Sequence, residues 1–73
     1  MSLVEIKTEI TGSIWKIVAK IGDQLEEDDT ILIMESMKME IPVSVIESGR
    51  LVEILVAEGD IATEGTVVAR LEV

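Results

Sequence analysis

The stretch that decides the fold is Gly12-Ser13-Ile14-Trp15-Lys16-Ile17, with Gly22-Asp23 after it. The same pattern returns as Gly49-Arg50-Leu51-Val52-Glu53-Ile54 with Gly59-Asp60, at an offset of 37 residues (49 − 12 = 37). Similarity at a fixed offset is the signature of a repeated structural unit. We therefore predict a single domain, residues 1–73, with internal halves at about 1–37 and 38–73.

Short strands fit both halves. Each Gly-Asp pair is flanked by short apolar runs, which indicates a tight turn between strands, and Gly12, Gly49 and Gly65 predict further breaks. Because a small isolated sheet is only marginally stable in water, neither half could bury its apolar face alone. We therefore predict an all-β sandwich or barrel, in which two halves of three or four strands each pair face to face about a pseudo-two-fold axis.

The segment around Lys38 also fits a helix. Four of its apolar residues have the spacing of an amphipathic helix, namely Ile33, Met34, Met37 and Ile41. The repeat favours a strand instead, because residues 31–35 correspond to residues 68–72, where apolar and charged residues alternate. Pro42 disfavours the helical conformation at Ile41. The sequence therefore predicts that Lys38 lies in a hairpin turn that joins the two halves.

The composition argues against several functional classes. With six Lys and Arg against fifteen Asp and Glu, the net charge of −9 disfavours nucleic acid and anionic membranes as partners. Cysteine and histidine are absent, which excludes a disulfide framework, the usual zinc ligands and thiol or imidazole catalysis. No segment approaches the ~20 apolar residues of a membrane span. We expect a soluble, cytoplasmic, monomeric protein without catalytic activity or a metal site, whose single aromatic residue, Trp15, packs in the core or at its rim.

The joint between the halves carries Glu35-Ser36-Met37-Lys38-Met39-Glu40. This hexapeptide resembles the biotinyl attachment motif, in which a Met-Lys-Met triplet presents the acceptor lysine, although the usual residue at Ser36 is Ala. The resemblance extends over the whole chain, because biotinyl and lipoyl domains consist of two quasi-symmetric halves. It implies a flattened barrel of two four-stranded antiparallel sheets, similar to small free-standing biotin/lipoyl attachment proteins and to the biotin carboxyl carrier domain.

The resemblance also implies a function. A biotin protein ligase would join biotin covalently to Lys38, and the biotin would carry carboxyl groups between the biotin carboxylase and carboxyltransferase components of a biotin-dependent carboxylase. Recognition by the ligase or by partners would involve the flanking residues Glu35, Ser36, Met37, Met39 and Glu40. Singly, Lys38 could be a solvated charge and the two methionines could fill a core. Together, at the junction of the repeat, they favour a carrier.

Lysine suits this task chemically. It combines a long flexible stem with an amine that forms a stable amide, and a tethered group meets each active site at a high effective concentration. An exposed lysine amine is mostly protonated near neutrality, so its activation must come from the modifying enzyme. We expect Met37 and Met39 to lie on one side of an extended segment, with Lys38 on the other, and to offer an adaptable apolar surface.

Two other functions share this fold. A lipoyl carrier would serve an oxo-acid dehydrogenase or a glycine cleavage system by acyl or aminomethyl transfer, but lipoyl domains usually have Asp-Lys-Ala where this chain has Met37-Lys38-Met39. Modification with both biotin and lipoate is also compatible with a small attachment protein. An unmodified interaction module is the third possibility, and such modules generally lack the acceptor lysine.

Overall fold

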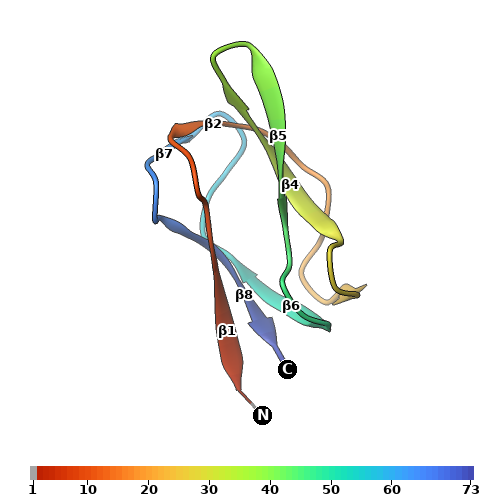
Figure 1. Cartoon of the computed structure of the whole chain (residues 1–73). Coiled ribbons are helices and arrows are strands. Elements are labelled where there is room, and N and C mark those ends of the chain that lie inside the picture. Colours follow the sequence, from red (N-terminus) through yellow and green to blue (C-terminus); the bar gives the residue numbers. More distant parts are fainter. Residues whose placement is uncertain (1) are drawn as a thin grey trace.

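The computed structural model describes residues 2–73, and within this range it forms two four-stranded antiparallel sheets (Figure 1). The strands are β1 (Leu3–Lys7), β2 (Gly12–Ile17), β3 (Gln24–Leu25), β4 (Thr30–Ser36), β5 (Met39–Ser44), β6 (Gly49–Ile54), β7 (Ile61–Ala62) and β8 (Val67–Glu72). One sheet has the order β1-β8-β6-β3 and the other has the order β5-β4-β2-β7. The all-β prediction is confirmed, and the alternative helix around Lys38 does not form. Pro42 lies on β5, an edge strand, where a missing N–H is tolerated.

The pseudo-two-fold axis is visible in the backbone hydrogen bonds. The amide of Gly22 donates to the carbonyl of Leu51 at 2.7 Å, and the equivalent amide of Gly59 donates to Ile14 at 2.7 Å. Both glycines have positive φ, at 97° and 94°, as the predicted Gly-Asp turns require. An offset of 37 residues also converts the order β1-β8-β6-β3 into β5-β4-β2-β7.

The halves interleave, which the sequence does not predict. Each sheet contains two strands from residues 1–37 and two from residues 38–73, whereas the repeat was expected to form one sheet from each half. This interleaving of strands from the two halves has a physical reason. A strand of one half gains hydrogen-bond partners from the other half, as β1 does from β8 and β2 from β7, so the backbone groups of the small halves are satisfied across the axis.

The core between the sheets is aliphatic and nearly free of polar groups. Its most deeply buried side chains are Ile14, Ile31, Leu32, Met34, Val45, Leu51, Val68 and Leu71. Thr8 is also buried, with its hydroxyl oxygen 2.9 Å from the sulfur of Met34. Within residues 2–73, every buried side-chain nitrogen or oxygen has a hydrogen-bond partner, and no helix is long and apolar enough to cross a membrane.

One sequence prediction about a single residue needs correction. Trp15 is 47% exposed, because the β2–β4 register shifts between Ile14 and Lys16 and leaves the indole on a bulge outside the core. Gly12 and Gly49 are the first residues of β2 and β6, so the predicted breaks between strands lie directly before them. At both glycines the backbone of another strand approaches too closely to admit a side chain.

Candidate functional site

Lys38 lies in a two-residue turn at the tip of the β4–β5 hairpin. Ser36 pairs with Met39, so Met37 and Lys38 are the two central residues of the turn. Their φ angles are 52° and 66°, and positive φ at both central positions is the mark of the type I′ turn that matches the twist of a hairpin. The hairpin prediction is confirmed. The extended triplet is wrong, because the tight reversal takes Met37 and Lys38 out of the strand conformation.

The tip is exposed to solvent. Lys38 is exposed, and the exposed fractions of Met37 and Met39 are 91% and 63%, so neither methionine fills the core. The hairpin protrudes from one end of the molecule, while the start of β1 and the end of β8 lie at the other end (Figure 1). Exposed methionine side chains at a protruding tip are unusual for a solvated surface and suit an adaptable contact with a partner.

The two predicted recognition carboxylates lie side by side at the base of this tip. Glu35 on β4 pairs directly with Glu40 on β5, and both residues are exposed. Like charges directly opposite one another destabilise a sheet. The cross-strand partner of Glu35 on its other side is Ser13, which carries no charge. The hairpin therefore presents an uncompensated pair of negative charges next to Lys38.

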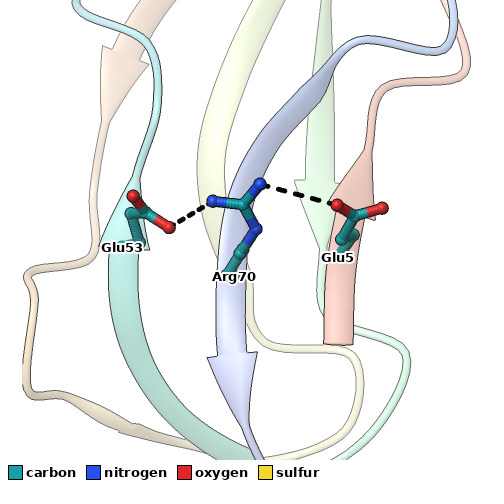
Figure 2. Close-up of polar contacts among 3 residues, drawn as sticks. All are labelled: Glu5, Glu53 and Arg70. Atoms are coloured by element: carbon teal, nitrogen blue, oxygen red, sulfur yellow. Dashed lines mark hydrogen bonds and ion pairs between the residues drawn. The ribbon is translucent and has the colours of Figure 1, made fainter. Parts of the chain in front are cut away.

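The outer face of the other sheet is different, because its charges are paired. Arg70 on the central strand β8 lies between Glu53 and Glu5, with a hydrogen bond to Glu53 and an ion pair of 3.6 Å to Glu5 (Figure 2). The hydrogen bond and charge of Glu53, together with Glu5, raise the pKa of the Arg70 guanidinium. Arg50 similarly contacts Glu72 at 3.0 Å. This sheet neutralises its own carboxylates.

Ser36 is half-buried at the neck of the hairpin and makes a contact that the sequence does not predict. Its hydroxyl donates to the carbonyl oxygen of Thr11 at 3.0 Å, which ties β4 to the connection between β1 and β2. The structure thus brings all six residues of the motif onto one hairpin, with Lys38 at its tip. Thr11 was missed, because its contact with Ser36 uses a backbone carbonyl that any residue type would provide.

The reactive group at the tip of the hairpin is the primary amine of Lys38. Within residues 2–73, no group of three or more His, Cys, Asp or Glu side chains could hold a metal ion. A groove does exist, but it runs between the edge strands β1 and β5 and is lined by Leu3, Ile6, Ile41, Val43 and Ile46, among others. Lys38 is absent from that lining. What the tip offers is an accessible primary amine on a hairpin that is paired into a four-stranded sheet.

Comparison with known proteins agrees with this geometry. A family model described as "Biotin-requiring enzyme" matches residues 3–71. The chain belongs to the biotin/lipoyl attachment family. Its relatives in this family include the "Biotin/lipoyl attachment protein" of Bacillus subtilis (strain 168), which is 41% identical over 66 residues that cover 90% of each chain. The "Biotinylated protein TB7.3 homolog" of Mycobacterium leprae (strain TN) is 35% identical over 89% of this chain and 92% of that protein.

A solved structure shows the same attachment fold inside a much larger enzyme. The match to the Kluyveromyces lactis urea carboxylase has a TM-score of 0.93 and 36% sequence identity. It covers 99% of this chain but only 6% of the carboxylase chain. The biotin/lipoyl attachment domain of this chain is therefore similar to a small part of a carboxylase, and it corresponds in length to the small bacterial relatives.

Proposed function

We propose that this chain is a biotin carrier that a biotin protein ligase modifies on Lys38. The observation that carries the proposal is the exposed lysine at the tip of a two-residue hairpin, between two exposed methionines. The ligase supplies biotin as an activated acyl group. An amide forms between the Lys38 Nζ and the biotin carboxyl carbon, the activating group leaves, and the amine releases a proton.

The biotinyl group would then carry a carboxyl group between two active sites. One belongs to a biotin carboxylase component and the other to a carboxyltransferase component, and the similarity to part of a urea carboxylase supports this assignment. The cofactor supplies the chemistry, while the protein supplies reach and orientation. In this proposal the chain works as a cytoplasmic monomer without catalytic groups of its own.

The residues around Lys38 would serve recognition. Met37 and Met39 give the ligase an apolar surface that adapts to its own, and Glu35 and Glu40 give it a negative patch. Because the two carboxylates repel each other in the free protein, a cationic ligase surface would relieve that repulsion on binding. This explains why the sheet retains a like-charge pair at this position.

The test is the intact mass after incubation with a biotin protein ligase, biotin and ATP. We expect the mass to rise by one biotinyl group and the Lys38→Arg variant to stay unmodified. Lys16→Arg is the matched control, because Lys16 is exposed on the same sheet yet lies away from the tip. Unmodified wild-type protein, or a modified Lys38→Arg variant, would contradict the proposal.

A lipoyl carrier is the second candidate, because a relative of similar length is named "Biotin/lipoyl attachment protein". The same hairpin would present Lys38 to a lipoate ligase for acyl transfer chemistry. Parallel incubation with a lipoate ligase distinguishes the two cofactors by mass. Modification by both enzymes would establish a dual attachment protein. If neither enzyme modifies the chain, and the protein isolated from its own cell is also unmodified, the result would favour an unmodified interaction module.

A further inference from the structure

The neck of the β4–β5 hairpin is tied to the body of the protein by side chains. The Ser36 hydroxyl donates to the Thr11 carbonyl oxygen at 3.0 Å, and the amide of Glu64 donates to the Thr11 Oγ1 at 2.9 Å. Thr11, in the connection between β1 and β2, therefore contacts both the β4–β5 hairpin and the turn before β8. We call Thr11, Ser36 and Glu64 the collar.

Close packing at Gly12 brings the parts of the collar together. A Cβ atom at Gly12 would lie 2.5 Å from the carbonyl oxygen of Glu35 and 3.2 Å from the Cβ of Ser36. The first of these distances is far below van der Waals contact, so only glycine allows β2 to approach the hairpin neck this closely. This approach places the Thr11 carbonyl within reach of the Ser36 hydroxyl.

The segment that carries Thr11 is itself anchored in the core. The buried Thr8 hydroxyl accepts a hydrogen bond from the Ile10 amide at 3.2 Å and lies 3.0 Å from the Ile10 carbonyl oxygen. The same hydroxyl contacts the sulfur of Met34, which is fully buried on the strand that leads to Ser36. The buried Thr8 thus contacts both partners of the Ser36–Thr11 hydrogen bond indirectly: Ile10 precedes Thr11, and Met34 lies on the strand that leads to Ser36.

The opposite end of the molecule, which the pseudo-two-fold axis relates to the hairpin, has no equivalent of this hydrogen bond within residues 2–73. The position equivalent to Ser36 is Val73, which has no hydroxyl. The position equivalent to Thr11 is Ser48, whose hydroxyl donates to Glu26 at 3.2 Å instead. Since the same backbone fold forms at that end without it, the Ser36–Thr11 hydrogen bond is not a requirement of the fold.

We propose that Ser36 is a positioning residue for the modification of Lys38. Its hydrogen bond to Thr11 holds the Met37–Lys38 turn in one orientation relative to the sheets, so that the modifying enzyme binds a pre-formed turn. Two non-glycine residues with positive φ adopt this backbone reluctantly, which makes external support at the neck useful. A binding surface ordered in advance loses less entropy on association. This inference rests on the proposed function, because it assumes that Lys38 is the modified residue.

The experiment compares Ser36→Ala with Ser36→Thr, which keeps the hydroxyl, and with Ser44→Ala. Ser44 is the matched control, because it lies at the far end of the same hairpin and its hydroxyl is 3.5 Å from that of Thr30. Two quantities are measured on the unmodified chain: amide hydrogen exchange at Met37, Lys38 and Met39, and the kcat and KM of biotin ligation with the chain as substrate. Urea denaturation confirms that each variant is folded.

We expect Ser36→Ala to speed exchange at the three tip amides and to raise the KM by about two- to tenfold, the effect of one lost hydrogen bond. The kcat should stay unchanged, because the reacting amine is the same. Ser36→Thr should restore both values, and Ser44→Ala should change neither.

The outcomes separate this inference from the proposed function. Equal exchange in wild type and Ser36→Ala would overturn the tie itself, and faster exchange with an unchanged KM would overturn its role in recognition. A wild-type chain that no ligase modifies would overturn the proposed function and with it the role of Ser36 in modification. The exchange rates would still show in that case whether Ser36 orders the tip.

Discussion

The two ends of the molecule are related by the pseudo-two-fold axis, and they share a backbone but differ in their side chains. At one end, the strand pair β4–β5 continues to Ser36 and Met39 and is closed by the Met37–Lys38 turn. At the other end, the pair β8–β1 continues to Val73 and Ser2, which exchange backbone hydrogen bonds of 2.9 and 3.2 Å. The terminal end therefore serves as an internal control. What both ends possess belongs to the fold, and what only the hairpin end possesses is a candidate for function.

The same comparison separates the outer faces of the two sheets. Glu72 and Glu35 are equivalent positions, and Glu72 is paired with Arg50 while Glu35 faces Glu40. A protein selected for stability alone gains nothing from the second arrangement. In the proposed function a partner binds next to Lys38, so we propose that these uncompensated carboxylates belong to its recognition surface. The predictions below test how far the symmetry extends, starting with the core.

Truncation of equivalent core residues should have the largest effect. Met34 and Leu71 occupy equivalent positions and are both fully buried. Replacing either with Ala leaves a cavity, and we expect each change to lower the free energy of unfolding by about 2–5 kcal/mol, measured by urea denaturation. Met34→Leu makes the two positions identical and should cost under about 1.5 kcal/mol. A large cost at only one of the two positions would show that the core is less symmetric than the backbone.

The glycines at the strand crossings should come next. A Cβ at Gly12 would meet the Glu35 carbonyl at 2.5 Å, and a Cβ at Gly49 would meet the Glu72 carbonyl at 2.8 Å. We expect Gly12→Ala and Gly49→Ala each to destabilise the protein by about 1–3 kcal/mol through overpacking. Only Gly12→Ala should also slow modification of Lys38, because it displaces the hairpin neck. If modification of Lys38 slows equally in both variants, the cause is general destabilisation of the protein.

The sequence predicts the strands and the two-fold repeat, because the Gly-Asp pairs and the apolar runs around them recur at an offset of 37 residues. It does not predict that the halves interleave. An alternating strand shows which of its faces is buried, but not which strand lies beside it. The bulge that exposes Trp15 depends on the local register of β2 and β4, so composition alone placed the indole too deep.

The site was predicted in part for similar reasons. The motif locates Lys38 on a hairpin, since the repeat requires a joint there. The positive φ angles of Met37 and Lys38 were not foreseen, because type I′ turns usually contain Asn and Gly. The tie from Ser36 to Thr11 was also missed. It joins residues 25 positions apart through a main-chain atom, and no pattern of side chains records such a contact.

Equivalent turns with different residues should give a smaller effect. Asp28 and Gly65 are related by the offset and have φ angles of 74° and 88°. A Cβ at Gly65 would meet no atom within 4 Å, so the cost of Gly65→Ala is conformational and should be about 1–2 kcal/mol. Asp28→Gly should raise the thermal midpoint slightly, because glycine adopts this backbone without a steric penalty. If Asp28→Gly destabilised the protein instead, the aspartate side chain would be stabilising its own turn.

Charge reversal at Glu40 should have the smallest effect on stability and a clear effect on function. Glu40→Lys replaces a repulsive cross-strand pair with an attractive one opposite Glu35, so we expect a gain of about 0.2–1 kcal/mol that shrinks at high salt. The matched control is Leu3→Lys, because Leu3 is the equivalent residue and its neighbour Glu72 already has Arg50 as a partner. Leu3→Lys should therefore gain less.

The functional result of Glu40→Lys decides what the carboxylate pair is for. If the pair recognises the ligase, this variant should be more stable and yet show a higher KM for modification, while Leu3→Lys should be modified normally. Stability and recognition would then change in opposite directions at one residue, which a purely structural role cannot produce. If the KM for modification of Glu40→Lys equals that of the wild type, recognition depends on the Met37–Lys38–Met39 tip. The two carboxylates are then simply solvated charges on the hairpin.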